Sequence, residues 1–114
     1  MIKKDANIDR EPEYNPCGGE GTFTLTNLVK DGELSTIVKT VIVDAPVGSY
    51  AEYHQHTGDS ELYYILEGKA EFTENDKSKH ILEPGDVSIT YDGEWHAIAQ
   101  YGDEPLKFLA IIIR

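Results

Sequence analysis

The sequence predicts an all-β domain, an antiparallel barrel or sandwich, and three observations lead to this prediction. Nine short runs rich in β-branched and aromatic residues recur between Thr22 and Ile113. Turn sequences such as Asp31-Gly32 and Pro84-Gly85 separate these runs. No window combines the hydrophobic period of a helix with helix caps.

The expected strands follow one another at turn spacing. They are Thr22–Val29, Ser35–Val43, Tyr50–His56, Glu61–Leu66, Ala70–Thr73, Lys79–Leu82, Val87–Thr90, His96–Tyr101 and Leu106–Ile113. The last is apolar on both faces, which is typical of a strand between two sheets or in a subunit interface. Residues 1–21 hold Pro12, Pro16 and several glycines without periodicity. We therefore expect an N-terminal arm or loop over 1–21 and one barrel domain over 22–114.

The composition is that of one small acidic domain. The chain has 114 residues, which suits a single core, and its 39% hydrophobic content is typical of globular rather than disordered proteins. The formal net charge of -11 repels phosphate backbones and anionic lipid heads. Neither nucleic acid nor a membrane is therefore an expected partner.

Cysteine content and the N-terminus favour a cytoplasmic location. Cys17 is the only cysteine, so no internal disulfide holds the fold together, and we expect it to be an ordinary thiol. Residues 1–13 contain no apolar run of the signal-peptide type, and no segment approaches the ~20 apolar residues of a membrane span.

Three of the four histidines form a pattern that suits a metal ion. His54 and His56 are separated by one residue, so on a strand both imidazoles project from one face. Glu61 follows a short turn and could return to the same pocket through a hairpin. His96 lies after a later turn and depends on the fold to reach the others. His80 lies near a hairpin turn, where we expect it to be exposed.

The spacing around these residues resembles the first motif of the cupin family. Every fixed position of that motif is filled, by Gly48, His54, His56, Glu61 and Gly68. A second, less complete motif has Gly85, Gly93 and His96 in register, with Tyr91 where the family usually has proline and Gln100 where it often has asparagine.

The resemblance implies a cupin β-barrel, antiparallel and of the double-stranded β-helix or jelly-roll type, preceded by the N-terminal arm. It implies one divalent transition metal on His54, His56, Glu61 and His96. Such a ligand set suits Mn, Fe, Ni, Co, Cu or Zn, and the sequence does not choose among them. Four ligands on a six-coordinate ion leave two positions for water, dioxygen or a bidentate oxygen ligand. Because cupins commonly pair, we also expect a homodimer.

Side chains alternate between the two faces of a strand, so positions an even number of residues from a ligand are further candidates for the pocket. Tyr63 shares the parity of Glu61, Ile98 and Gln100 share that of His96, and Tyr50 shares that of His54 if the strand has no bulge. The alternative is that these side chains simply fill a small barrel.

These observations lead to two functional hypotheses. The first is a metalloenzyme acting on a small oxygen-rich molecule, of dioxygenase, decarboxylase or isomerase type. The second is a barrel that binds or senses a small molecule or metal without turnover. The only arginines are Arg10 and Arg114, and the two motif strands contain no lysine. This distribution of cations favours a neutral or mono-anionic ligand over a dianion.

Overall fold

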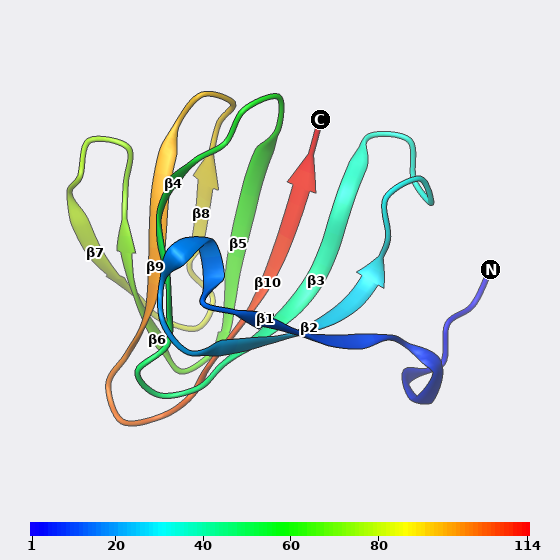
Figure 1. Ribbon diagram of the computed structural model, residues 1–114, viewed down its shortest axis with the longest axis horizontal. Helices are drawn as coiled ribbons and strands as arrows, with labels where there is room; N and C mark the ends of the chain where they lie inside the picture. The colour runs from blue at the N-terminus through cyan, green and yellow to red at the C-terminus, as the bar shows by residue number, and fades with distance from the viewer.

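The computed structural model describes residues 1–114 and contains ten strands in two antiparallel sheets that face each other (Figure 1). The strands are β1 (Arg10–Tyr14), β2 (Thr22–Val29), β3 (Ile37–Ala45), β4 (Tyr50–Gln55), β5 (Ser60–Glu67), β6 (Lys69–Thr73), β7 (Lys79–Leu82), β8 (Val87–Thr90), β9 (Trp95–Tyr101) and β10 (Leu106–Ile113). The predicted all-β jelly-roll barrel is confirmed, and each of the nine expected strands is present. No helix in the structure has the length and apolar character needed to cross a membrane.

The six-stranded sheet has the order β1-β2-β3-β10-β5-β8, and the four-stranded sheet has the order β4-β9-β6-β7. The last strand, β10, therefore lies in the middle of the larger sheet, between β3 and β5 (Figure 1). This position explains why Leu106–Ile113 is apolar on both faces. Phe108 and Ala110 point into the core, whereas Leu109 and Ile111 are half-buried on the outer face.

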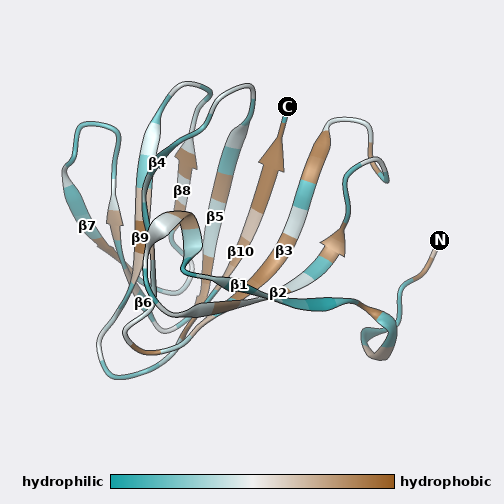
Figure 2. Cartoon of the chain, viewed as in Figure 1, coloured by the Kyte–Doolittle hydropathy of each residue, from teal (hydrophilic) through white to brown (hydrophobic).

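The core lies between the inner faces of the two sheets. Hydrophobic colouring covers most of β10 and most of β3, which has a hydrophilic band, whereas β7 changes from hydrophilic to hydrophobic along its length (Figure 2). The ring of Phe108 is 1% exposed and meets the rings of Phe23 and Tyr63 edge to face, with ring centroids 6.2 and 4.9 Å apart. Such edge-to-face geometry is favoured between aromatic rings. One continuous core therefore reaches from β2 across β10 to β5.

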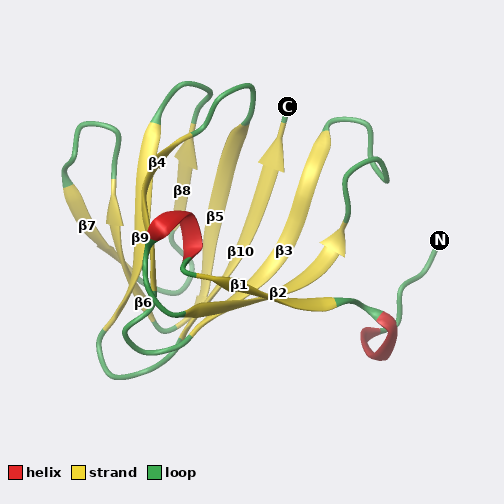
Figure 3. Ribbon diagram, in the orientation of Figure 1, coloured by secondary structure: helices red, strands yellow, loops and turns green.

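Residues 1–21 are more ordered than the predicted arm or loop. Strand β1 pairs with β2, and two short 3-10 turns, η1 (Asp5–Asn7) and η2 (Pro16–Gly18), flank it (Figure 3). The sequence pattern did not predict β1, because an edge strand with mostly exposed residues needs no hydrophobic alternation. Gly19 packs η2 onto β4, since a Cβ atom at this position would lie 2.1 Å from the carbonyl oxygen of Tyr50.

Candidate metal centre

The four residues of the predicted ligand set meet at one end of the barrel interior. His54 lies on β4 directly opposite His96 on β9, His56 follows the end of β4, and Glu61 is near the start of β5. One ligand atom from each residue lies within 4.8 Å of all the others. His56, Glu61 and His96 are buried, and His54 is half-buried. Two different sheets therefore supply one compact cluster of nitrogen and oxygen donors.

Each imidazole uses its Nδ1 atom for a hydrogen bond directed away from the cluster. The Nδ1–H groups of His54 and His56 donate to the carbonyl oxygen of Glu52 (2.6 Å) and to a carboxylate oxygen of Asp59 (2.7 Å), and the Nδ1 atom of His96 hydrogen-bonds with the hydroxyl of Thr90 (2.7 Å). A neutral imidazole that donates from Nδ1 has a free lone pair on Nε2. Metal-binding histidines usually carry an outer partner of this kind, which fixes the ring and its tautomer.

The Nε2 atoms converge on one point. The Nε2 atom of His96 lies 3.0 Å from that of His54 and 3.0 Å from that of His56. An oxygen of Glu61 lies 2.9 Å from the Nε2 atom of His56 and 3.2 Å from that of His96. Without a metal, a proton on the Nε2 atom of His56 satisfies the contact with Glu61, and a bound metal would take the place of that proton. A cation at the centre satisfies all four donors, so the residues present fit a metal ion.

Without a bound metal ion, the side chains of the cluster shift one another's pKa values. Burial opposes ionisation of Glu61, but hydrogen bonds from His56 and His96 outweigh it and lower the pKa of this carboxyl to about 2. The hydrogen bond to Glu61 raises the pKa of His56 to about 9, against the effect of burial and with help from Asp59. Burial lowers the pKa of His96. Glu61 is therefore an anion over the whole physiological range.

A cavity of about 190 Å³ opens beside the cluster. Three of the four candidate ligands, His54, His56 and Glu61, line it. Its other walls come from the core and the N-terminal segment, and include Glu13, Cys17, Lys39, Ala51 and Tyr63. The Tyr63 ring stacks on the His96 ring, with centroids 5.0 Å apart. Since the cavity touches the candidate ligands, a molecule inside it would reach a metal held there.

Of the predicted pocket residues, Tyr63 lines this cavity and Tyr50 does not. Between Ala51 and His54 the register of β4 on β9 shifts by one residue, which marks a β-bulge. The bulge reverses the parity on which the Tyr50 prediction depended, so Ala51 faces the interior with His54. The Tyr50 backbone instead holds the N-terminal segment through hydrogen bonds with Glu20.

The structure also places Ile98 and Gln100 away from the cavity. Ile98 is 1% exposed and fills the core below His96. The Gln100 amide braces two loops, because its oxygen accepts from the Gly48 N–H and its nitrogen donates to the carbonyls of Gly102 and Glu104. Each residue along a strand adds about 3.3 Å, so Gln100 lies far from His96 although it shares the same face.

Sequence reasoning missed three groups that line the cavity. Glu13 and Cys17 come from the segment expected to be an arm, and no pattern connected that segment to the site. Burial raises the pKa of the Cys17 thiol, and Glu13 and Glu61 raise it further, whereas the charge of Lys39 opposes them. Lys39 shares the parity of the buried residues Val41 and Val43, so its inward direction was readable from the sequence.

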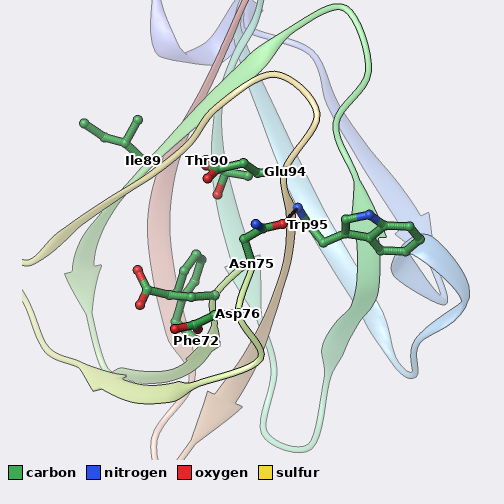
Figure 4. Close-up of a pocket in the computed structure, with 8 residues that line it drawn as sticks. Phe72, Asn75, Asp76, Ile89, Thr90, Glu94 and Trp95 are labelled. Atoms are coloured by element: carbon green, nitrogen blue, oxygen red, sulfur yellow. Dashed lines mark hydrogen bonds between the residues drawn. The ribbon is translucent and has the colours of Figure 1, made fainter.

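A second cavity, of about 260 Å³, is lined in part by Thr90, whose hydroxyl hydrogen-bonds with His96 (Figure 4). It contains Glu74, Asp76 and Glu94 but no histidine. Trp95 points away from the other lining residues in Figure 4, and its ring stacks on Tyr53 with centroids 5.4 Å apart. Successive side chains along a strand point to opposite faces, so Trp95 and His96 point in opposite directions. The second cavity therefore lacks the donors that distinguish the first.

This chain is similar to known proteins in family, sequence and structure. The family model described as "Cupin domain" matches residues 41–112. An oxalate-binding protein of Thermotoga maritima is 34% identical over 99% of this chain and 93% of its own length. A Thermotoga maritima crystal structure, described as a predicted oxalate decarboxylase, has a TM-score of 0.91 and 32% identity, covering 99% of this chain and 98% of that one.

A larger enzyme shows similarity over part of its length. Oxalate decarboxylase of Bacillus subtilis is 28% identical over 87% of this chain, which spans only 27% of that enzyme. The family match covers well over half of the residues and includes the whole candidate metal centre. Together with a full-length relative at 34% identity, it shows that this chain belongs to the cupin family.

Proposed function

We propose that the chain binds one divalent transition metal on His54, His56, Glu61 and His96 and uses it to bind a small carboxylate such as oxalate. The observation that carries the proposal is the convergence of three Nε2 lone pairs and one buried carboxylate on a single point. The full-length similarity to an oxalate-binding protein supports the ligand class.

The donor separations favour a six-coordinate ion. Neighbouring ligands with bonds of ~2.1 Å lie ~3.0 Å apart around an octahedral ion and ~3.4 Å apart around a tetrahedral one. Four of the six donor separations, at 2.9 to 3.2 Å, are close to the first arrangement, and all six lie within 4.8 Å. When bound, such an ion supplies a Lewis-acid centre with two open positions, enough for one bidentate carboxylate. Manganese, iron, cobalt and nickel suit this geometry better than zinc does.

Metal content and oxalate binding test the proposal together. We expect untagged protein to hold one equivalent of metal by elemental analysis, and the double variant His54→Ala, His96→Ala to hold none. His80→Ala is the matched control, because this exposed histidine lies outside the cluster. Calorimetry should detect oxalate binding to metal-loaded protein and not to metal-free protein. Oxalate binding of equal strength to both forms would contradict the proposal.

Turnover is the second candidate function, and Glu13 is the observation that favours it. This half-buried carboxyl lines the cavity, where it could deliver a proton. In decarboxylation, oxalate loses its carbon–carbon bond and takes up one proton, giving formate and carbon dioxide. If turnover occurs, Glu13→Gln should lower the rate of formate release at least tenfold while metal content stays unchanged. No formate from the metal-loaded protein would leave binding as the function.

We also propose that two copies pair through an outer apolar face. This face is a grid of uncharged residues on adjacent strands, Leu109 and Ile111 of β10, Leu62 and Tyr64 of β5, and Val87 and Ile89 of β8. Val87 and Ile89 are 53% and 52% exposed. A second copy presents the same uncharged grid, whereas the rest of this acidic chain repels itself.

The cytoplasmic location stays a prediction.

Light scattering after size exclusion tests the pairing. Wild type should have the mass of a dimer, and Ile89→Glu that of a monomer, because a charge inside the outer apolar face is costly to bury. Ile81→Glu places the same charge at an exposed position of the other sheet and should remain dimeric. A monomeric wild-type protein would exclude the pairing.

A further inference from the structure

Lys39 lies on the same transverse row of the six-stranded sheet as the candidate metal ligand Glu61. The register places Lys39 of β3 opposite Ile112 of β10, and Ile112 opposite Glu61 of β5. Neighbouring strands lie ~4.8 Å apart, so the two backbones are ~10 Å apart. All three side chains line the cavity beside the metal centre. The long side chain of Lys39 can therefore reach a molecule bound beside Glu61.

Lys39 has no ion-pair partner in the protein. Seven of the ten basic residues pair with a carboxylate, and these are Lys3, Arg10, Lys30, Lys69, Lys79, Lys107 and Arg114. Acidic residues outnumber basic ones by 21 to 10, yet none of them pairs with Lys39. Lys4 and Lys77 are also unpaired but lie outside the cavity. Lys39 is therefore the one cation free to meet a ligand there.

A bound metal and Lys39 would supply the positive charges around the cavity. A divalent ion carries two positive charges, Glu61 removes one, and neutral imidazoles add none. Lys39 restores one, so these three groups together balance two negative charges. Glu13 also lines the cavity and carries the opposite sign, so it offsets part of this charge, and Lys39 is the cation in the lining that can meet an anionic group. The volume of about 190 Å³ corresponds to roughly six water molecules, which suits a ligand the size of oxalate.

We propose that Lys39 binds the end of the ligand that is remote from the metal, so that the site selects a small dicarboxylate over a monocarboxylate of similar size. The inference rests on the proposed function, because a metal must hold the near end. An ammonium group donates a charge-assisted hydrogen bond to carboxylate, which is stronger than a bond between neutral groups. The sequence favoured a neutral or mono-anionic ligand because the two motif strands contain no lysine. Lys39 lies on β3, which is outside both motifs.

Calorimetry on the metal-loaded full chain tests this role with two probes. Oxalate has two carboxylates, whereas glycolate chelates a metal through one carboxylate and one hydroxyl. We expect Lys39→Met to weaken oxalate binding about ten- to a hundredfold and to leave glycolate binding and metal content unchanged. Lys4→Met removes the same charge from an exposed position outside the cavity and should change neither affinity.

Glu13→Gln supplies a test of opposite sign, because it removes a negative charge from the same cavity. It should tighten oxalate binding, and a weakening would contradict the charge argument. If wild type binds oxalate and Lys39→Met binds it equally well, or loses both probes equally, the role of Lys39 is overturned while the proposed function stands. If metal-loaded wild type binds neither probe, the proposed function fails, and the role of Lys39 fails with it.

Discussion

Saturating the metal-free protein with a suitable divalent ion should raise its melting temperature by about 15 °C. An ion present at a thousandfold excess over its dissociation constant stabilises the folded state by about 4 kcal/mol. Each kcal/mol shifts the transition of a domain of this size by about 4 °C. Differential scanning calorimetry with and without chelator measures the shift. The effect is large because the folded chain assembles the four donors from two sheets, whereas the unfolded chain does not.

A graded series of variants separates the cluster from non-specific metal effects. Removing an outer partner of a ligand lowers metal affinity about 10- to 100-fold, so Asp59→Asn should keep about half of the shift at the same metal concentration. His54→Ala removes a ligand and should keep less than about 5 °C, since it costs more than an outer partner does. His80→Ala should keep the full shift. A full shift in His54→Ala would exclude His54 as a ligand.

Local patterns predicted most of the fold and the ligand set. Turn sequences and β-branched runs depend on neighbouring residues only, so the strands could be read from short windows. The pairing of His54 with His56 also depends on a local rule, the alternation of side chains along a strand. His96 could not be placed by this rule, and only the resemblance to a family with known motifs connected it to Glu61.

What the sequence did not predict depends on tertiary structure. The bulge in β4 has no signature in Tyr50–Gln55, yet it turns Ala51 rather than Tyr50 toward the interior. The contribution of Cys17 depends on η2 packing against β4, a contact between segments about thirty-five residues apart. Lys39 differs from these cases, because its parity with Val41 and Val43 was visible. It lies on β3, outside both motifs, so no motif position connected it to the metal centre.

Phe108→Ala should be the most destabilising single substitution in the core, costing about 3–5 kcal/mol of unfolding free energy. The side chain is 1% exposed on the central strand β10, and its ring meets Phe23 and Tyr63. No neighbour can collapse into the space easily, because rigid strands hold both sides. Urea unfolding of the metal-free protein measures the loss. Tyr101→Ala removes an aromatic ring that is 47% exposed and should cost about 1 kcal/mol or less.

Phe108→Ala should also weaken metal binding, because Phe108 packs against Tyr63, whose ring stacks on the candidate ligand His96. Tyr63 packs between Phe108 and His96, with centroid distances of 4.9 and 5.0 Å. A cavity at Phe108 frees Tyr63 to move, and His96 then loses the ring that fixes its orientation. Metal affinity measured on the folded variant should fall about tenfold, whereas Tyr101→Ala should leave it unchanged. Loss of stability with full metal affinity would show that the Phe108–Tyr63 contact does not position His96, and that other neighbours such as Thr90 and Phe72 hold it.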